Sequence, residues 1–231
     1  MKTIGMLGGM SWESSAVYYR ILNREVQTRL GVVHSAKTLM YSFDFGEMSV
    51  LQHSGKMAEA NDLMATVAVN LAKSGADFLM ICCNTMHTAS ALMEQAARIP
   101  LLHIADPLGA AIVQSGFSRP ALLGSKFTME QDDILRGRLK TRYGIDVVVP
   151  EGADAAEVSR VIYEELVRGK FLDSSRKAYR DIIARLVARR ADCVILGCTE
   201  LPMLVMAEDS AVPLFDTTTL HAMAAVDMAL S

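Results

Sequence analysis

Short apolar segments alternate with longer amphipathic segments along the whole chain. In the first half the short segments predict strands over 2–7, 37–43, 77–83 and 100–104. The longer segments carry apolar residues at helical spacing and predict helices over 12–30, 57–73 and 85–97. Strands and helices that alternate in this way predict a parallel, layered α/β sheet.

The second half repeats this pattern. A strand is expected over 146–149, and helices are expected over 155–168, 174–190 and 217–230. Three features of the first half recur in the same order: Gly8 and Gly124 are 116 residues apart, Cys83 and Cys198 are 115 apart, and Pro100 and Pro213 are 113 apart. Such a nearly constant offset predicts an internal duplication.

The duplication predicts an α/β fold of two pseudo-symmetric lobes, each a parallel-sheet α/β sandwich, with the active site between them. We expect the N-terminal lobe to comprise 1–105 with a crossing C-terminal helix at 217–231, and the C-terminal lobe to comprise 106–216. The sequence has no linker, so this boundary depends on the repeat alone.

Composition narrows the class of protein. With 51% hydrophobic and 21% charged residues in 231, the chain is expected to be globular. The net charge of −3 gives no general electrostatic case for nucleic acid or for an anionic membrane. No apolar run approaches the roughly 18 residues of a membrane span, and no cleavable signal is recognisable. We therefore expect a cytoplasmic protein with a small-molecule substrate.

The four cysteines form no spaced disulfide framework, which favours reduced thiols. Their spacing also differs from that of zinc-binding motifs, so no metal site is expected.

Cys83 and Cys198 each end an apolar strand and are followed at once by a polar helix start. Ligands bind at the carboxyl ends of parallel strands, and a helix N-terminus favours a thiolate. If one thiol approached each face of a single carbon, the two sulfurs would be roughly 6–7 Å apart. One thiolate would then remove a proton while the opposite thiol delivers one, which inverts a stereocentre.

Strand cysteines are also ordinary small core residues, and this alternative applies to each of the four. Cys82 competes with Cys83, because neighbouring strand side chains point to opposite faces. The repeat aligns Cys83 with Cys198 and so favours Cys83. Cys82 and Cys193 are then expected to be packing residues.

Several polar residues accompany these turns. Asn84, Thr85 and Thr199 are at helix starts, where they are expected to bind an α-carboxylate, to cap the helix, or both. Ser11 is expected to cap the first helix.

Five other polar residues each allow two interpretations, one functional and one structural. Glu200 and His87 are candidates to assist proton transfer at Cys198 and Cys83, or are simply satisfied helix residues. Gln52, Arg168 and Lys170 are candidates to bind a distal carboxylate, or lie on a solvated face.

Three motifs together resemble the aspartate/glutamate racemase family: Gly8-Gly9-Met10-Ser11-Trp12-Glu13-Ser14, Cys83-Asn84-Thr85-Met86-His87 and Gly197-Cys198-Thr199-Glu200. The resemblance extends over essentially the whole chain. It implies amino-acid racemisation without pyridoxal phosphate or another cofactor, by a two-base mechanism that uses Cys83 and Cys198. It also implies that the protein forms a homodimer.

The resemblance assigns substrate binding to Met10, Gln52, Asn84, Thr85, Ser125, Thr128 and Thr199, and most nearly to Arg168, with Lys170 as the alternative cation. Ser11 and Glu200 are auxiliary residues.

The expected function is racemisation of acidic amino acids, aspartate or glutamate or both. The alternatives are a related maleate isomerase, hydantoin racemase or decarboxylase, and a non-catalytic protein that binds small carboxylates.

Overall fold

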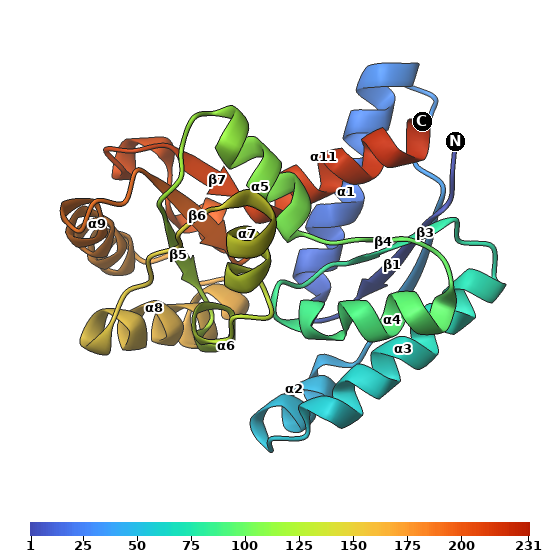
Figure 1. Ribbon diagram of the computed structural model, residues 1–231, viewed down its shortest axis with the longest axis horizontal. Helices are drawn as coiled ribbons and strands as arrows, with labels where there is room; N and C mark the ends of the chain where they lie inside the picture. The colour runs from blue at the N-terminus through green and yellow to red at the C-terminus, as the bar shows by residue number, and fades with distance from the viewer. The chain divides into compact units, whose positions relative to one another are not determined.

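The computed structural model describes residues 1–231. The chain divides into two compact units: Met1–Ile104 with His221–Ser231, and Ala105–Leu220. The division therefore falls inside the last helix, α11 (Thr217–Leu230). Each unit contains a parallel sheet with helices packed on it (Figure 1). The predicted α/β class is confirmed.

The first unit has a four-stranded sheet in the order β2-β1-β3-β4. Its strands are β1 (Ile4–Gly8), β2 (Thr38–Ser42), β3 (Phe78–Ile81) and β4 (Leu101–Leu102), and every pair is parallel. Its other elements are α1 (Trp12–Leu30), α2 (Phe45–His53), α3 (Met57–Lys73), the 3₁₀ helix η1 (Thr85–Ala89) and α4 (Ser90–Ala97). The strand order reverses between β1 and β3, and ligands of open α/β sheets bind at such a switch point.

Both faces of this sheet are covered. Leu79 and Ile81 of β3 belong to an apolar cluster with α3 and α4, whereas Phe78 and Met80 belong to a second cluster with α1 and α11. Figure 1 shows these helix pairs on opposite faces of the first unit's sheet. Burial on both faces explains why the strand sequence is apolar without alternation.

The second unit has a three-stranded parallel sheet in the order β5-β6-β7. Its strands are β5 (Pro120–Gly124), β6 (Cys193–Gly197) and β7 (Leu214–Asp216). A parallel bridge joins Val148 to Ala121 on the outer side of β5. The order of Val148, β5, β6 and β7 therefore repeats the order of β2, β1, β3 and β4.

The prediction of a strand over 146–149 is wrong, because only this single bridge forms there. The N–H of Val148 donates to Pro120 O at 2.8 Å, and the N–H of Leu122 donates to Val148 O at 2.8 Å. Pro150 follows two residues later and has no N–H with which to extend the pairing.

The helical elements of the second unit are α5 (Ala105–Gln114), α6 (Lys126–Glu130), α7 (Arg136–Tyr143), α8 (Gly152–Glu164), η2 (Leu166–Arg168), α9 (Asp173–Ala188), α10 (Leu201–Leu204) and η3 (Ala207–Asp209). Helices α8 and α9 run antiparallel. Arg185 binds both carboxylate oxygens of Asp154 at 2.8 and 2.7 Å, and the Tyr179 hydroxyl donates to Val158 O at 2.8 Å.

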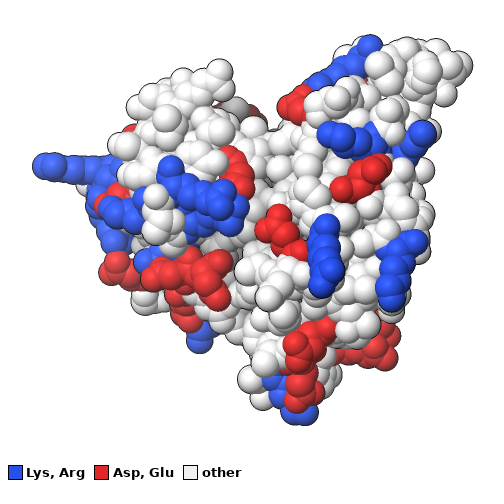
Figure 2. All heavy atoms as spheres, turned by 45° about the vertical axis from the view of Figure 1, so that its right-hand side comes forward, with Lys and Arg blue, Asp and Glu red and all other residues white.

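Charged side chains of both signs are intermixed on the surface that Figure 2 shows. None of the helices combines the length and the apolar character needed to cross a membrane.

Candidate functional site

The turn after β1 is a tight glycine turn. Gly9 has φ +88°, and a Cβ there would lie 2.2 Å from Phe43 O and 2.4 Å from Phe43 N. The N–H of Phe43 donates to Gly8 O at 3.0 Å, so the turn is tied to the end of β2. Only glycine fits a position with positive φ and such close backbone.

Serine side chains fix the start of α1 beside this turn. Ser11 is the N-cap, as predicted, and accepts a hydrogen bond from the N–H of Ser14 at 3.3 Å. Ser15 Oγ accepts from the N–H of Gly9 at 2.8 Å and donates to Ser11 O at 3.1 Å. The side chain of Met10 is buried in the apolar cluster of α3 and α4.

The adjacent cysteines at the end of β3 have different environments. Cys82 is fully buried in the cluster of α1 and α11, and this burial, with Cys83 close by, raises the pKa of its thiol far above the ordinary value. Cys83 packs beside the opposite cluster and is partly exposed. Reactivity requires an accessible thiol that can ionise, so Cys83 is the candidate of the two.

Polar residues surround the turn that follows Cys83. Asn84 and Thr85 are buried at the start of η1. Gln52, near the end of α2, is also buried, and its Nε2 donates to Met86 Sδ at 3.0 Å. The structure therefore brings Gln52 next to the segment that carries Cys83.

His87 holds the backbone of this turn. Its Nε2 accepts from the N–H of Ile104 at 3.2 Å, so the ring proton is on Nδ1, which donates to Cys83 O at 2.9 Å and Asn84 O at 3.2 Å. Burial, and then the neighbouring His103 and His221, lower the pKa of His87 well below its ordinary value. His87 is therefore neutral, and its two ring nitrogens are engaged by the backbone. Of the two interpretations of His87, the structure favours a structural residue whose ring nitrogens are hydrogen-bonded to the backbone.

The turn after β5 repeats the serine cap of α1. Ser125 is the N-cap of α6 and accepts from the N–H of Thr128 at 3.3 Å, and the two hydroxyls are 3.1 Å apart. The Thr128 methyl group would lie 3.6 Å from a Cβ placed on Gly197. Helix α6 thus packs against the end of β6, directly before Cys198.

Cys198 lies in a hydrogen-bonded cluster at the end of β6. Its partly exposed thiol donates to Glu200 Oε2 at 2.9 Å, and the Thr199 hydroxyl donates to the same oxygen at 2.7 Å. Thr199 and Glu200 are buried. Cys193, at the other end of β6, is fully buried, and burial beside Asp192 raises its pKa far above the ordinary value.

The predicted cations lie in the turn between α8 and α9. Arg168 ends η2 and its N–H donates to Glu165 O at 2.9 Å, while the N–H of Lys170 donates to the same oxygen at 3.0 Å. Both side chains are exposed. The Glu165 carboxylate accepts from Arg160 Nη1 at 2.8 Å.

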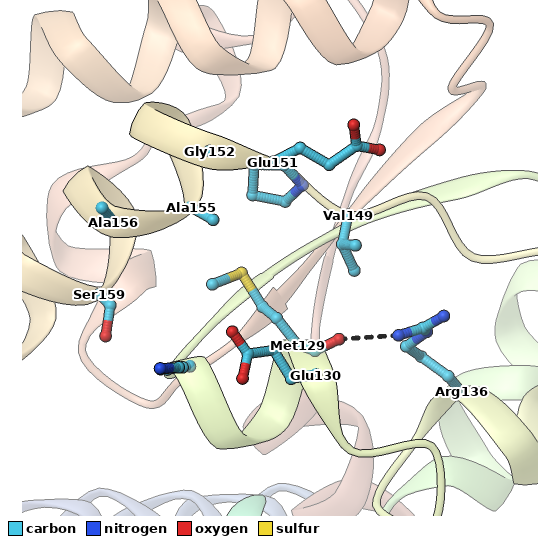
Figure 3. Close-up of a pocket in the computed structure, with 11 residues that line it drawn as sticks. Met129, Glu130, Arg136, Val149, Glu151, Gly152, Ala155, Ala156 and Ser159 are labelled. Carbon is cyan, nitrogen blue, oxygen red and sulfur yellow. Dashed lines mark hydrogen bonds between the residues drawn. The ribbon is translucent and has the colours of Figure 1, made fainter.

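A cavity of about 580 Å³ in the second unit was not signalled by any motif (Figure 3). It lies between α6 and the first turns of α8, and Arg136 closes one side by donating to Met129 O at 3.0 Å. Its lining residues are Lys126, Met129, Glu130, Arg136, Val149, Pro150, Glu151, Gly152, Ala155, Ala156 and Ser159. The lining includes neither Cys83 nor Cys198.

Known proteins resemble the chain over its full length. A crystal structure of a Yersinia pestis protein assigned as an Asp/Glu racemase has 46% identity and a TM-score of 0.94, and covers 100% of both chains. An aspartate racemase homologue from Pyrococcus horikoshii OT3 has 28% identity and a TM-score of 0.87, also over 100% of both chains.

A curated relative is the broad specificity amino-acid racemase RacX of Bacillus subtilis (strain 168). It is 24% identical over 167 residues, which cover 71% of this chain and 70% of that protein.

The sequence profile of Asp/Glu/hydantoin racemases matches residues 7–225, which include the glycine turn and both cysteine turns. The chain belongs to the Asp/Glu/hydantoin racemase family and is therefore an isomerase of the racemase type.

Proposed function

We propose that the protein racemises acidic amino acids without a cofactor, with Cys83 and Cys198 as the two acid–base groups. The observation that carries the proposal is the repeated strand-end thiol. In each unit the partly exposed cysteine follows an inner strand of the sheet, Cys83 after β3 and Cys198 after β6. Both turns contain buried polar residues. One thiolate removes the α-proton and the other thiol delivers a proton to the opposite face of the same carbon.

Removing an α-proton requires stabilisation of the carbanion, whose charge spreads onto the α-carboxylate. Polar residues lie at the helix starts together with backbone N–H groups; they are Asn84, Thr85, Ser125 and Thr199. Such fixed donors stabilise a developing negative charge because they need no reorganisation during the reaction. Their assignment to the α-carboxylate is part of the proposal.

The acidic substrate is supported by the family and by the aspartate racemase homologue from P. horikoshii. Gln52, Arg168 and Lys170 are the proposed contacts for the distal carboxylate. The broad specificity of RacX favours a wider substrate range as the second candidate. The proposal includes a homodimer that acts in the cytoplasm.

Incorporation of solvent deuterium at Cα tests the proposal, across a panel of enantiopure amino acids in D₂O. We expect aspartate or glutamate to exchange and to lose optical purity, starting from either enantiomer. Exchange with neutral amino acids alone would overturn the acidic substrate. Tight binding of carboxylates without any exchange would indicate a binding protein instead.

Cys193→Ala is a matched control for the two thiols, because Cys193 begins β6, the strand whose last residue directly precedes Cys198. We expect this variant to retain racemisation, whereas Cys83→Ser and Cys198→Ser each abolish it.

A further inference from the structure

We propose that Glu165 is the positioning residue for the cation that binds the distal carboxylate of the substrate. Glu165 fixes the connection between α8 and α9, which we call the α8–α9 loop (165–172) and which carries Arg168 and Lys170. This inference rests on the proposed function, because it takes one of these two cations as the contact for an acidic substrate. The anchoring of the loop itself can be measured without substrate.

The far part of the α8–α9 loop is exposed. Helix α8 ends at Glu164, the turn η2 follows, and α9 begins at Asp173. Gly169 reverses the chain with φ +67°. Residues 168–172 are all exposed. Exposed side chains have little packing to hold them, so the direction of a cation here depends on how firmly the loop backbone is fixed.

The backbone of Glu165 closes this turn. Its carbonyl oxygen accepts from the N–H of Arg168 at 2.9 Å and from the N–H of Lys170 at 3.0 Å. The N–H of Gly169 donates to Leu166 O at 2.9 Å. The main chain of both candidate cations is therefore tied directly to residue 165, and any movement of residue 165 moves them as well.

The side chain of Glu165 ties the loop to both helices. Its Oε1 accepts from Arg160 Nη1 at 2.8 Å, and its Oε2 accepts from Ser175 Oγ at 2.5 Å. Arg160 belongs to α8 and Ser175 to α9. One carboxylate thus bridges the end of one helix and the beginning of the next.

Burial strengthens this bridge. Glu165 is 7% exposed and Ser175 is 2% exposed. Hydrogen bonds to an ionised carboxylate are stronger than those between neutral groups, and a buried group that loses its partner keeps the full cost of leaving water. The α8–α9 loop is therefore held at residue 165 and exposed at the residues that carry the cations.

The neighbouring carboxylates of α8 provide controls. Arg160 also binds both oxygens of Glu157, each at 2.8 Å, so it retains a partner when Glu165 is replaced. Glu164 is exposed and lies 3.4 Å from Arg160. Both of these contacts lie within α8. Replacing Glu165 should consequently release the α8–α9 loop and leave helix α8 in place.

The expected kinetic effect is on KM. When a binding group is in place for only a fraction of the time, the apparent affinity falls by that fraction. We expect Glu165→Ala to raise the KM for aspartate or glutamate about three- to tenfold, and to keep kcat within about twofold. The value of kcat is retained because proton transfer takes place at the cysteine turns.

Limited digestion by trypsin tests the anchoring directly in the substrate-free protein. Trypsin cleaves after lysine and arginine, so the bonds after Arg168 and Lys170 report on the α8–α9 loop. Cleavage requires local opening of the chain. Peptide mass spectrometry should show cleavage at these bonds about three- to tenfold faster in Glu165→Ala. The bond after Arg190, in the exposed turn that follows α9, is the internal reference and should be cleaved at the wild-type rate.

Three further variants make the test specific. Glu164→Gln should leave the cleavage rates and the KM unchanged. Glu165→Gln keeps the size of the side chain and one acceptor oxygen, so its effects should be smaller than those of Glu165→Ala. Ser175→Ala removes only the contact to α9, and it should also accelerate cleavage in the α8–α9 loop. If Glu165→Ala does not fold, Ser175→Ala decides the question.

A double-mutant cycle distinguishes positioning from a general structural role. If Glu165 acts through the cation, Glu165→Ala should cause no further rise in KM once Arg168→Gln has removed that cation. Lys170→Gln takes the place of Arg168→Gln if Lys170 is the contact. A residue that merely stabilises the fold would instead give effects on KM that multiply.

Unchanged cleavage of the α8–α9 loop in folded Glu165→Ala and Ser175→Ala variants would overturn the inference. So would faster cleavage with an unchanged KM in Glu165→Ala, or multiplying effects in the double mutant, and the proposed function would then still stand. A wild-type protein that exchanges no acidic amino acid would refute the proposed function and the positioning role with it. Faster cleavage in Glu165→Ala would in that case still establish Glu165 as the anchor of the loop.

Discussion

The packing of Gly9 against Phe43, in the turn after β1, allows a quantitative test of how this turn is held in place. Gly9→Ala introduces two separate costs. The first is the positive φ of +88°, which L-residues rarely adopt. The second is the contact of the new Cβ with Phe43 O at 2.2 Å and Phe43 N at 2.4 Å, which are backbone atoms and cannot rotate away.

Gly75 separates these two costs. It has φ +98° but no atom within 4 Å of an added Cβ, so Gly75→Ala carries only the backbone cost. That cost is about 1 kcal/mol. Overpacking adds about 1–3 kcal/mol at Gly9, which brings the expected loss in free energy of unfolding there to about 2–4 kcal/mol.

Thermal or urea unfolding of the two variants measures this difference. For a chain of this size, the loss at Gly9 corresponds to a fall in Tm of roughly 4–16 °C. We expect Gly75→Ala to keep wild-type racemisation, and Gly9→Ala to lose part of it because the turn after β1 must move. Equal destabilisation by the two substitutions would refute the claim that the packing of Gly9 on Phe43 defines this turn.

Further expectations concern the buried histidine, the neighbouring thiol and the cation. The pKa of His87 in the folded protein lies below the unfolded value of about 6.5, so the unfolded chain takes up the proton first as the pH falls. The contribution of neutral His87 to the free energy of unfolding is therefore complete above about pH 6.5. Below that pH it decreases by up to about 1.4 kcal/mol per pH unit. His87→Asn, which cannot titrate, should make this slope shallower in urea titrations between pH 5 and 7, and an unchanged slope would contradict the neutral His87. Cys82→Ser buries a hydroxyl among apolar side chains and should cost about 1–3 kcal/mol in denaturant while exchange at Cα continues; loss of exchange in a folded variant would make Cys82 the reactive thiol. Arg168→Gln should raise the KM for aspartate or glutamate about tenfold or more and leave the KM for a neutral amino acid unchanged, since a charged contact is lost; if Lys170→Gln has this effect instead, Lys170 is the contact.

Features that depend on local sequence could be predicted. Helix α1 spans the predicted 12–30 and α3 the predicted 57–73, because their apolar spacing and the Ser11 cap are local signals. The cysteine turns were also recognisable, since each combines an apolar strand with an abrupt polar helix start, and the repeat provides a second copy of the pattern.

Features that depend on distant partners could not be predicted. The N–H of Ile104 fixes the tautomer of His87, and no motif of that turn contains this information. The extent of pairing at Val148 depends on its contact with β5 and on Pro150. The expected helix over 155–168 ends at Glu164, and a 3₁₀ turn continues to Arg168 before α9 reverses direction. The cavity beside α6 combines residues from three separate segments.

The central claim is that Cys83 and Cys198 act on opposite faces of one carbon, and a crossover experiment tests it most directly. Cys83→Ser and Cys198→Ser are each incubated with each enantiomer of the substrate in D₂O, and deuterium at Cα is measured together with optical purity. We expect neither variant to racemise, and each to exchange deuterium, with retention of configuration, into a different enantiomer. Exchange of the same enantiomer by both variants, or racemisation by either, would contradict the two-thiol account.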